Sequence, residues 1–198
     1  MFTGLVGGRV KVLEVSASGR DTHLSVDLGG YPGRVRIGDS VALSGTCCTV
    51  AAVAGNTASF VLSEETLRRT WFGDLEPGQV LNVEAALRAG DPMGGHVVQG
   101  HVDGVGEVVT PVAPTGGELW IRLPQDLLRY CVEKGSITVD GVSLTIAGLT
   151  GDRIMVAVIP HTAVVTTLGS VPAGGRVNIE VDILAKYVER LLAGRQPG

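Results

Sequence analysis

The sequence predicts an all-β protein: two tandem six-stranded Greek-key β-barrels related by internal duplication, followed by a C-terminal α-helix. The second half of the chain repeats the first at a constant shift, so that Gly4 matches Gly100 (100 − 4 = 96). Within each half, short segments alternate apolar and polar residues with the period of two that is typical of half-buried strands. The last segment instead places apolar residues at helical spacing.

The duplication runs from Gly4 to Glu84 in the first copy and from Gly100 to Glu180 in the second. A period this long indicates duplicated domains, because the repeats of solenoids are shorter. We therefore expect a first domain at residues 1–89, a second at residues 94–182, and a helix and tail at residues 183–198. The same shift also pairs Val12 with Val108, Ser40 with Ser136, Gly45 with Gly141, Thr49 with Thr145, Gly55 with Gly151, Thr66 with Thr162, Thr70 with Thr166, Gly73 with Gly169 and Asn82 with Asn178.

Each copy contains six predicted strands. They lie at residues 9–15, 23–28, 39–53 (two strands), 58–62 and 79–85, and in the second copy at 106–112, 118–123, 136–146 (two strands), 152–159 and 176–182. Six antiparallel strands can bury one face and leave no edge if the sheet closes, which favours a barrel.

Three helices are predicted between and after these strands. Ser63 is a typical N-cap, with Glu64 and Glu65 in the first turn of the helix that follows it. Pro124 begins a second short helix. The tail from Asp182 to Ala193 has five apolar residues at three-four spacing and could pack on a barrel or on copies of itself; they are Leu184, Tyr187, Val188, Leu191 and Leu192.

Composition narrows the class of protein. The 198 residues include 29 glycines and only 4% aromatic residues, which suits short strands and tight turns. A net charge of −4 without a Lys/Arg run disfavours nucleic acid and acidic membranes as partners. We expect no signal peptide and no membrane span, and the three cysteines do not suggest a disulfide framework, so a reducing cytoplasm is the expected setting.

Polar residues recur at one position of both copies. Strand alternation places Cys47 and Thr49 on one face, and the shift of 96 matches them to Ser143 and Thr145. A lone cysteine is more often a small core residue, as we expect for Cys48. Recurrence in both copies instead suggests a ligand site used twice.

The two neighbouring histidines are weaker candidates. His96 and His101 are predicted on opposite faces of a strand, which makes a poor metal pair. His101 is the better candidate for proton transfer, because glycines flank it and let a ligand approach the backbone. Asp182 is most simply an N-cap, and Lys134 most simply a solvated lysine.

Several motifs, in order along the whole chain, resemble those of alpha-type riboflavin synthases: MFTGLV, ETLRRT, GGHVVQGHVDG, DGVSLTI, VNIEVD and LAKYVERLL. The resemblance implies two barrels and a homotrimer formed through the C-terminal helices. It implies a transferase that converts two molecules of 6,7-dimethyl-8-ribityllumazine into riboflavin and 5-amino-6-ribitylaminouracil without cofactor or metal. Each active site would form between the N-terminal barrel of one subunit and the C-terminal barrel of another, and association with lumazine synthase stays open.

The resemblance also suggests site residues. Phe2, Cys47, His101, Ser143, Thr145 and Asp182 match positions that the family ties to catalysis. The N-barrel site would comprise Gly4, Leu5, Val6, Cys47, Cys48, Thr49, Val61, Leu62, Ser63, Glu64, Glu65, Thr66, Gly100, His101 and Val102. The C-barrel site would comprise Lys134, Ser143, Leu144, Thr145, Ala157, Val158, Ile159, Pro160, His161 and Thr162.

Two alternatives remain at this point. A non-catalytic lumazine- or flavin-binding protein could use the same duplicated barrel. It would be free to lose the second site, whereas Lys134, Ser143, Thr145 and Asp182 are all present here. A flavin-dependent reductase would need a nicotinamide-binding βαβ half, for which the chain has no room.

Overall fold

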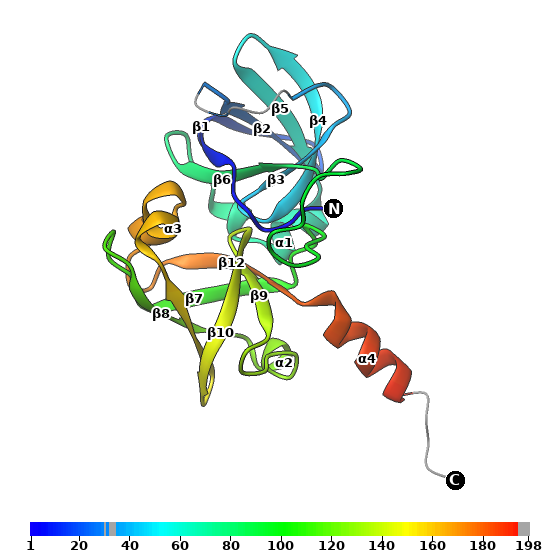
Figure 1. Cartoon of the computed structure of the whole chain (residues 1–198). Coiled ribbons are helices and arrows are strands. Elements are labelled where there is room, and N and C mark those ends of the chain that lie inside the picture. Colours follow the sequence, from blue (N-terminus) through cyan, green and yellow to red (C-terminus); the bar gives the residue numbers. More distant parts are fainter. Residues whose placement is uncertain (30, 32–34, 194–198) are drawn as a thin grey trace.

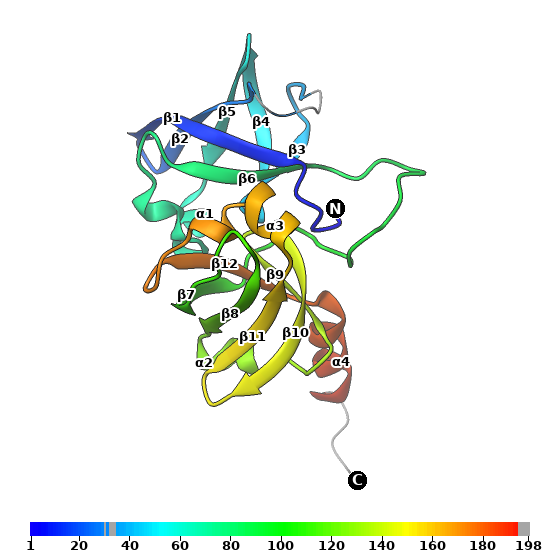
Figure 2. The same ribbon diagram turned by 60° about the vertical axis from the view of Figure 1, so that its left-hand side comes forward.

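The computed structural model describes residues 1–29, 31 and 35–193, and contains two closed antiparallel barrels of six strands each (Figures 1 and 2). The first barrel has the strand order β1-β2-β5-β4-β3-β6, and the second has the order β10-β11-β8-β7-β12-β9. These findings confirm the predicted fold class. The first barrel consists of β1 (Gly8–Ser18), β2 (Asp21–Asp27), β3 (Ser40–Leu43), β4 (Thr46–Ala54), β5 (Thr57–Leu62) and β6 (Val80–Ala85), and the second of β7 (Gly104–Thr110), β8 (Gly117–Arg122), β9 (Ser136–Val139), β10 (Val142–Thr150), β11 (Arg153–Val158) and β12 (Arg176–Val181).

The two barrels are copies in three dimensions as well as in sequence. The shift of 96 maps β3 onto β9, β4 onto β10, β5 onto β11 and β6 onto β12 without an offset at either end. It also maps helix α1 (Glu64–Arg69) onto α3 (Pro160–Val165). Short 3₁₀ turns follow both helices, η1 at Trp71–Asp74 and η2 at Leu168–Ser170.

Each barrel has its own core, filled by the inward residues of every strand. Leu24 and Phe60 are fully buried in the first barrel, and Leu119 and Ile137 are fully buried in the second. Cys48 belongs to the first core, as predicted, because alternation along β4 turns it inward between Cys47 and Thr49. Burial raises the pKa of the Cys48 thiol, so it stays protonated.

An approximate two-fold axis relates the barrels where they meet. Asn82 donates through Nδ2 to the Asp140 carbonyl at 2.8 Å, and its equivalent Asn178 donates to the Ser44 carbonyl at 2.9 Å. Gly45 and Gly141 also face each other, since a Cβ on either would lie 2.7 Å from the other's backbone nitrogen. Two buried amides therefore join two barrels at a glycine contact that admits no side chain.

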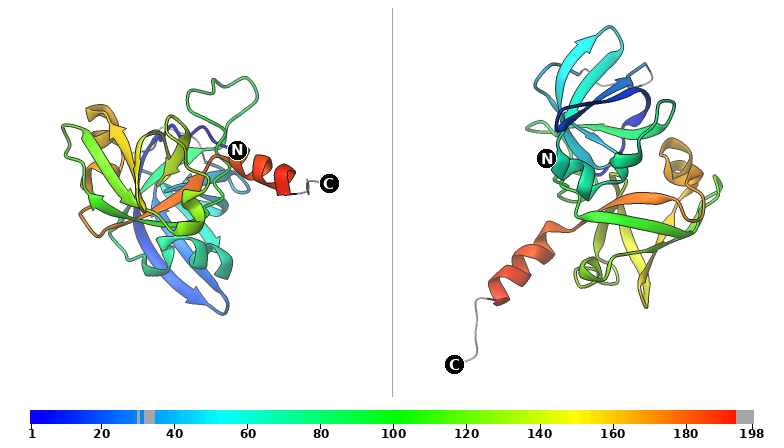
Figure 3. Two further views of the ribbon diagram at one scale, coloured as in Figure 1. Left: turned by 90° about the horizontal axis from the view of Figure 1, so that it is seen from below. Right: turned by 180° about the vertical axis from the view of Figure 1, so that it is seen from behind.

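Two helices lie outside the repeat. α2 (Gln125–Leu128) follows Pro124, and α4 (Ile183–Ala193) follows β12 and projects away from the barrels (Figures 1 and 3). Asp182 Oδ1 accepts the N–H of Leu184 at 3.0 Å, which confirms the predicted cap of α4. The five apolar residues of the predicted stripe are all exposed: Leu184, Tyr187, Val188, Leu191 and Leu192.

Candidate functional site

On the outer face of each barrel, three neighbouring strands place three residues in a row. A glutamate lies on one side of the central strand's residue, and a polar residue lies on the other side. In the first barrel, Ala42 of β3 is in register with both Glu84 of β6 and Cys47 of β4. In the second barrel, Thr138 of β9 is in register with both Glu180 and Ser143. Cys47 and Ser143, which the repeat pairs, therefore occupy equivalent positions on the outer faces of the two barrels.

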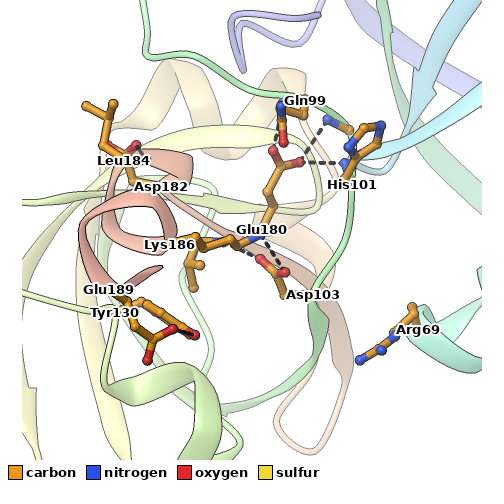
Figure 4. Close-up of polar contacts among 12 residues, drawn as sticks. Arg69, Gln99, His101, Asp103, Tyr130, Glu180, Asp182, Leu184, Lys186 and Glu189 are labelled. Atoms are coloured by element: carbon orange, nitrogen blue, oxygen red, sulfur yellow. Dashed lines mark hydrogen bonds and ion pairs between the residues drawn. The ribbon is translucent and has the colours of Figure 1, made fainter. Parts of the chain in front are cut away.

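The glutamate of each row accepts hydrogen bonds from the first residues of its own copy, which we call the opening segment. These residues are Thr3 and Gly4 in the first copy and Gln99 to His101 in the second. Glu84 accepts hydrogen bonds from the Thr3 N–H (2.7 Å), the Thr3 hydroxyl (2.8 Å) and the Gly4 N–H (3.0 Å). Glu180 accepts the N–H groups of Gln99 (2.7 Å), Gly100 (2.9 Å) and His101 (3.0 Å), as Figure 4 shows. Burial raises the pKa of both carboxyl groups above their ordinary values, and these donors oppose that shift.

Each opening segment then crosses to the other barrel. The Gly4 carbonyl accepts the N–H of Ser143 at 2.8 Å, and the Gly100 carbonyl accepts the N–H of Cys47 at 2.8 Å. Both glycines have left-handed φ angles, +76° and +77°. A Cβ on Gly4 would lie 2.5 Å from Ser143 Cβ, and one on Gly100 would lie 2.7 Å from Cys47 Cβ. Both positions therefore need glycine for the conformation and for the close approach.

This exchange corrects one grouping expected from the sequence. The sequence groups Gly4, Leu5 and Val6 with the N-barrel site, whereas the structure places Gly4 against Ser143 and Val6 against the core of the second barrel. The segment containing Gly100, which the sequence also groups with the N-barrel site, lies beside Cys47. Each site is thus built from one barrel and the opening segment of the other copy.

The first-barrel site, defined as the surroundings of Cys47, contains a cavity of about 470 Å³. Cys47 is half-buried there, and the fully buried Phe2 packs behind it and close to Gly100. Phe2 therefore shapes the wall of the site from inside. Six residues that the sequence predicts for the N-barrel site line the cavity: Cys47, Glu65, Thr66, Gly100, His101 and Val102. Six residues outside that prediction also line it: Thr46, Arg69, Thr70, Gln99, Asp103 and Lys186.

The second-barrel site, defined as the surroundings of Ser143, contains a histidine that the sequence analysis ranked low. His96 Nδ1 lies 2.7 Å from Ser143 Oγ, and its Nε2 lies 3.2 Å from Thr138 Oγ1. His96 and His101 do not share a strand, because residues 94–103 form an irregular segment with one bridge, between Phe2 and Val98. The backbone before His96 can lie this close to Thr3 because residue 95 is glycine: a Cβ there would lie 2.0 Å from the Thr3 carbonyl oxygen.

The protonation state of His96 follows from its surroundings. Burial lowers its pKa below the ordinary value, while the negative charge of nearby Asp182 opposes that shift. His96 is therefore neutral near pH 7, and one of its ring nitrogens donates to a hydroxyl while the other accepts from one. Asp182 both caps α4 and lies close enough to His96 to affect it.

The first turns of α1 and α3 differ in the side chains that accept hydrogen bonds from their backbone N–H groups. Ser63 Oγ accepts the Thr66 N–H at 3.2 Å at the start of α1. Ile159 holds the same position before α3 and makes no side-chain cap bond, and Pro160 follows it. The amides of His161 and Thr162 are therefore open to a ligand's carbonyl oxygen.

Six other predicted residues lie on the outer faces of the strands, in the cores or at a turn. Thr49 and Thr145 are exposed on the outer faces of β4 and β10, whereas the side chains of Cys48, Leu62 and Val158 are buried in the cores. Lys134 is exposed at the turn before β9, with a φ of 65°. Within the described residues, no cluster of three or more His, Cys, Asp or Glu side chains could hold a metal, and no helix is long and apolar enough to cross a bilayer.

Comparison with known proteins agrees with this architecture. The model of the lumazine binding domain matches residues 3–86 and 99–182. A riboflavin synthase of Photobacterium phosphoreum is 42% identical over 201 residues, covering 100% of this chain and 91% of that protein. One from Mycobacterium bovis (strain ATCC BAA-935 / AF2122/97) is 44% identical over 201 residues, with 97% and 98% covered.

Solved structures show the same fold at greater distance. The crystal structure of LumP complexed with riboflavin has a TM-score of 0.83 at 24% identity, covering 92% of this chain and 100% of LumP. The full-length matches at around 40% identity lie with riboflavin synthases. The chain therefore belongs to the lumazine-binding domain family, among its riboflavin synthases.

Proposed function

We propose that the protein is a riboflavin synthase, a transferase that moves a four-carbon unit between two molecules of 6,7-dimethyl-8-ribityllumazine. The products are riboflavin and 5-amino-6-ribitylaminouracil, and the reaction uses no cofactor. The observation that carries this proposal is the exchange of opening segments, which builds two equivalent sites around Cys47 and Ser143. A reaction that joins two copies of one substrate needs two such sites.

The chemistry divides between the sites. One lumazine loses a proton from its 7-methyl group, and the other gains a nucleophile at C7. Because the ring already acidifies the methyl group, the protein mainly holds two rings in reacting geometry, which can contribute roughly 7–11 kcal/mol. Ser143, in contact with the neutral ring of His96, provides a relay for the proton in the second-barrel site. Cys47 faces the ring bound in the first-barrel site.

Assembly is part of the proposal. The apolar stripe of α4 is between 54% and 73% exposed, which leaves a surface that a second and third copy of the helix would cover. A homotrimer would then bring the first-barrel site of one subunit to the second-barrel site of another. We place the enzyme in the cytoplasm, and association with lumazine synthase stays a prediction from the resemblance.

A turnover assay tests the proposal. Purified protein incubated with 6,7-dimethyl-8-ribityllumazine alone should accumulate riboflavin, measured by its absorbance, with one 5-amino-6-ribitylaminouracil per riboflavin. Gel filtration with light scattering, run beside it, should give three times the mass of the chain. Tight binding of the lumazine without riboflavin formation would instead identify a non-catalytic lumazine-binding protein.

A further inference from the structure

Asp103 fixes the far end of the segment that completes the first-barrel site. Its Oδ2 accepts the N–H of Val181, at the end of β12, at 3.0 Å. Its Oδ1 lies 2.6 Å from Lys186 Nζ, on α4 (Figure 4). Both side chains of this ion pair are largely shielded, with 28% of Lys186 and 19% of Asp103 exposed. The pair is therefore stronger than an ordinary surface contact.

The residues that reach Cys47 lie between two anchors. Glu180 holds the backbone from Gln99 to His101, and Asp103 holds the following residues against β12 and α4. His101 and Lys186 line the same cavity as Cys47. Asp103 is also held to β12 by its own N–H, which donates to the Ile179 carbonyl at 2.8 Å, so the ion pair with Lys186 is the part of this anchor that depends on where α4 lies.

This arrangement exists in the first-barrel site alone among the described residues. The shift of 96 maps Asp103 onto Gly7 and Lys186 onto Gly90, neither of which has a side chain. Gly7 instead packs against the ring of Tyr31, to which a Cβ would lie 2.9 Å away. The second-barrel site is thus independent of any such ion pair.

The helix that carries Lys186 shows its polar face to its own chain. Glu189, one turn after Lys186, contacts the Tyr130 hydroxyl and the Arg129 guanidinium beside α2, while the apolar stripe faces outward. A copy docked on the stripe would fix α4 from outside, and Lys186 would pass that restraint to Asp103. Assembly through the stripe and the restraint on the first-barrel site would therefore use the same helix.

We infer that Lys186 is a positioning residue of the first-barrel site, which couples the placement of the tail helix to the His101 segment over Cys47. The inference deepens the proposed function, on which its statement about lumazine binding rests. Its structural part, the restraint on the segment over Cys47, is measurable without substrate. Lys186 acts through Asp103 and does not take part in bond making.

The test compares Lys186→Met with Arg190→Met in the full-length protein, since both remove one positive charge from α4. Arg190 is exposed, and no ion pair is found for it among the described side chains. The readout is the rate at which iodoacetamide alkylates Cys47, followed by peptide mass spectrometry, because Cys48 and Cys131 are buried. Lys186→Met should raise this rate roughly threefold or more, and Lys186→Arg should restore it.

In turnover assays, Lys186→Met should raise KM by a similar factor and change kcat less, with the trimer intact. Asp103→Asn removes the same ion pair while keeping an acceptor for Val181, and should reproduce the effect if Lys186→Met fails to fold. An unchanged alkylation rate in both variants, or an equal rise in Arg190→Met, would overturn the inference. Failure of the wild-type protein to convert lumazine would overturn the proposed function alone, because the alkylation rates need no substrate.

Discussion

The two sites of this chain share a backbone design and differ in their side chains. Both use a glutamate to hold an opening segment, a left-handed glycine to approach the other barrel, and a polar residue at the same register. The first-barrel site is lined by charged groups, including Arg69, Asp103 and Lys186. Around Ser143 the side-chain contacts are the neutral His96 and Thr138.

The difference shows which parts of a duplicated module must stay fixed. The exchange of segments depends on Gly4 and Gly100 together, because the two-fold relation makes each copy complete the other. The side chains around the ligand are free to diverge, and here they diverge into a site with a thiol and one with a hydroxyl–imidazole pair. That division suits two identical substrates that play different chemical roles.

We expect the largest loss of turnover when the exchange of opening segments is blocked at one site. Gly100→Ala would push a methyl group to within 2.7 Å of Cys47 Cβ and strain a backbone at φ +77°. The segment over Cys47 must move, and a shift of about 1 Å can cost roughly 100-fold in kcat/KM. Gly4→Ala should do the same at Ser143, with the loss measured in the same turnover assay.

Gly55→Ala is the matched control for these variants. Its φ of +59° is also left-handed, but a Cβ there would meet nothing within 4 Å. It should cost about 1–2 kcal/mol of stability, measured by denaturant unfolding, and leave turnover unchanged. An active Gly100→Ala protein, or a Gly55→Ala protein equally inactive, would refute the role given to the exchange.

Much of this architecture was predictable because its signals are local. Alternation along β4 separates Cys47 from Cys48, the Ser63 cap marks the start of α1, and the stripe on α4 follows helical spacing. Alternation within each copy indicated the strands, and the repeat gave both copies the same order. These features depend on neighbours in sequence or on the repeat itself.

The missed features depend on contacts between segments that are far apart in the sequence. The sequence groups Gly4 with Cys47 because both belong to the same copy. Since Gly100 is also predicted beside Cys47, the symmetry of the repeat implies that Gly4 lies beside Ser143. His96 has no counterpart in the first copy, since 96 − 96 leaves no residue, so the repeat gave no clue to it. The pair of Lys186 and Asp103 joins the tail to the second copy's opening segment, a contact that no periodicity reveals.

A smaller effect separates the two adjacent thiols. Cys47→Ser changes a group that lines the cavity and should lower kcat/KM roughly tenfold, the equivalent of about 1.4 kcal/mol of lost interaction, without loss of stability. Cys48→Ser places a hydroxyl in the first core and should cost about 1–3 kcal/mol in the free energy of unfolding, with turnover preserved in the folded protein. Equal losses of turnover would mean that the outward sulfur has no special part in the site.

The last prediction concerns the junction between the barrels, where the copies also differ. Asp140 stands where the first copy has Ser44, and its Oδ1 accepts the Trp71 Nε1–H at 2.9 Å and the Asn178 N–H at 2.8 Å. Burial raises the pKa of Asp140 to about 7, against the effect of these two donors. Because the folded pKa is higher than the unfolded one, the folded protein binds the extra proton between them, and stability falls as pH rises from about 4 through 7.

Asp140→Asn should remove that pH dependence, because the amide keeps an acceptor oxygen and carries no charge. We expect wild-type unfolding free energy to fall by roughly 1–4 kcal/mol more than that of the variant between pH 5 and pH 8, measured by urea unfolding. Asp21→Asn, at an exposed strand end, is the control and should keep the wild-type slope. His96, whose pKa is lowered, acts with the opposite sign and weakens the fold only as pH falls through its unfolded value near 6.5. A variant with the wild-type slope above pH 6 would show that the buried carboxylate at this junction is stabilised in its charged form.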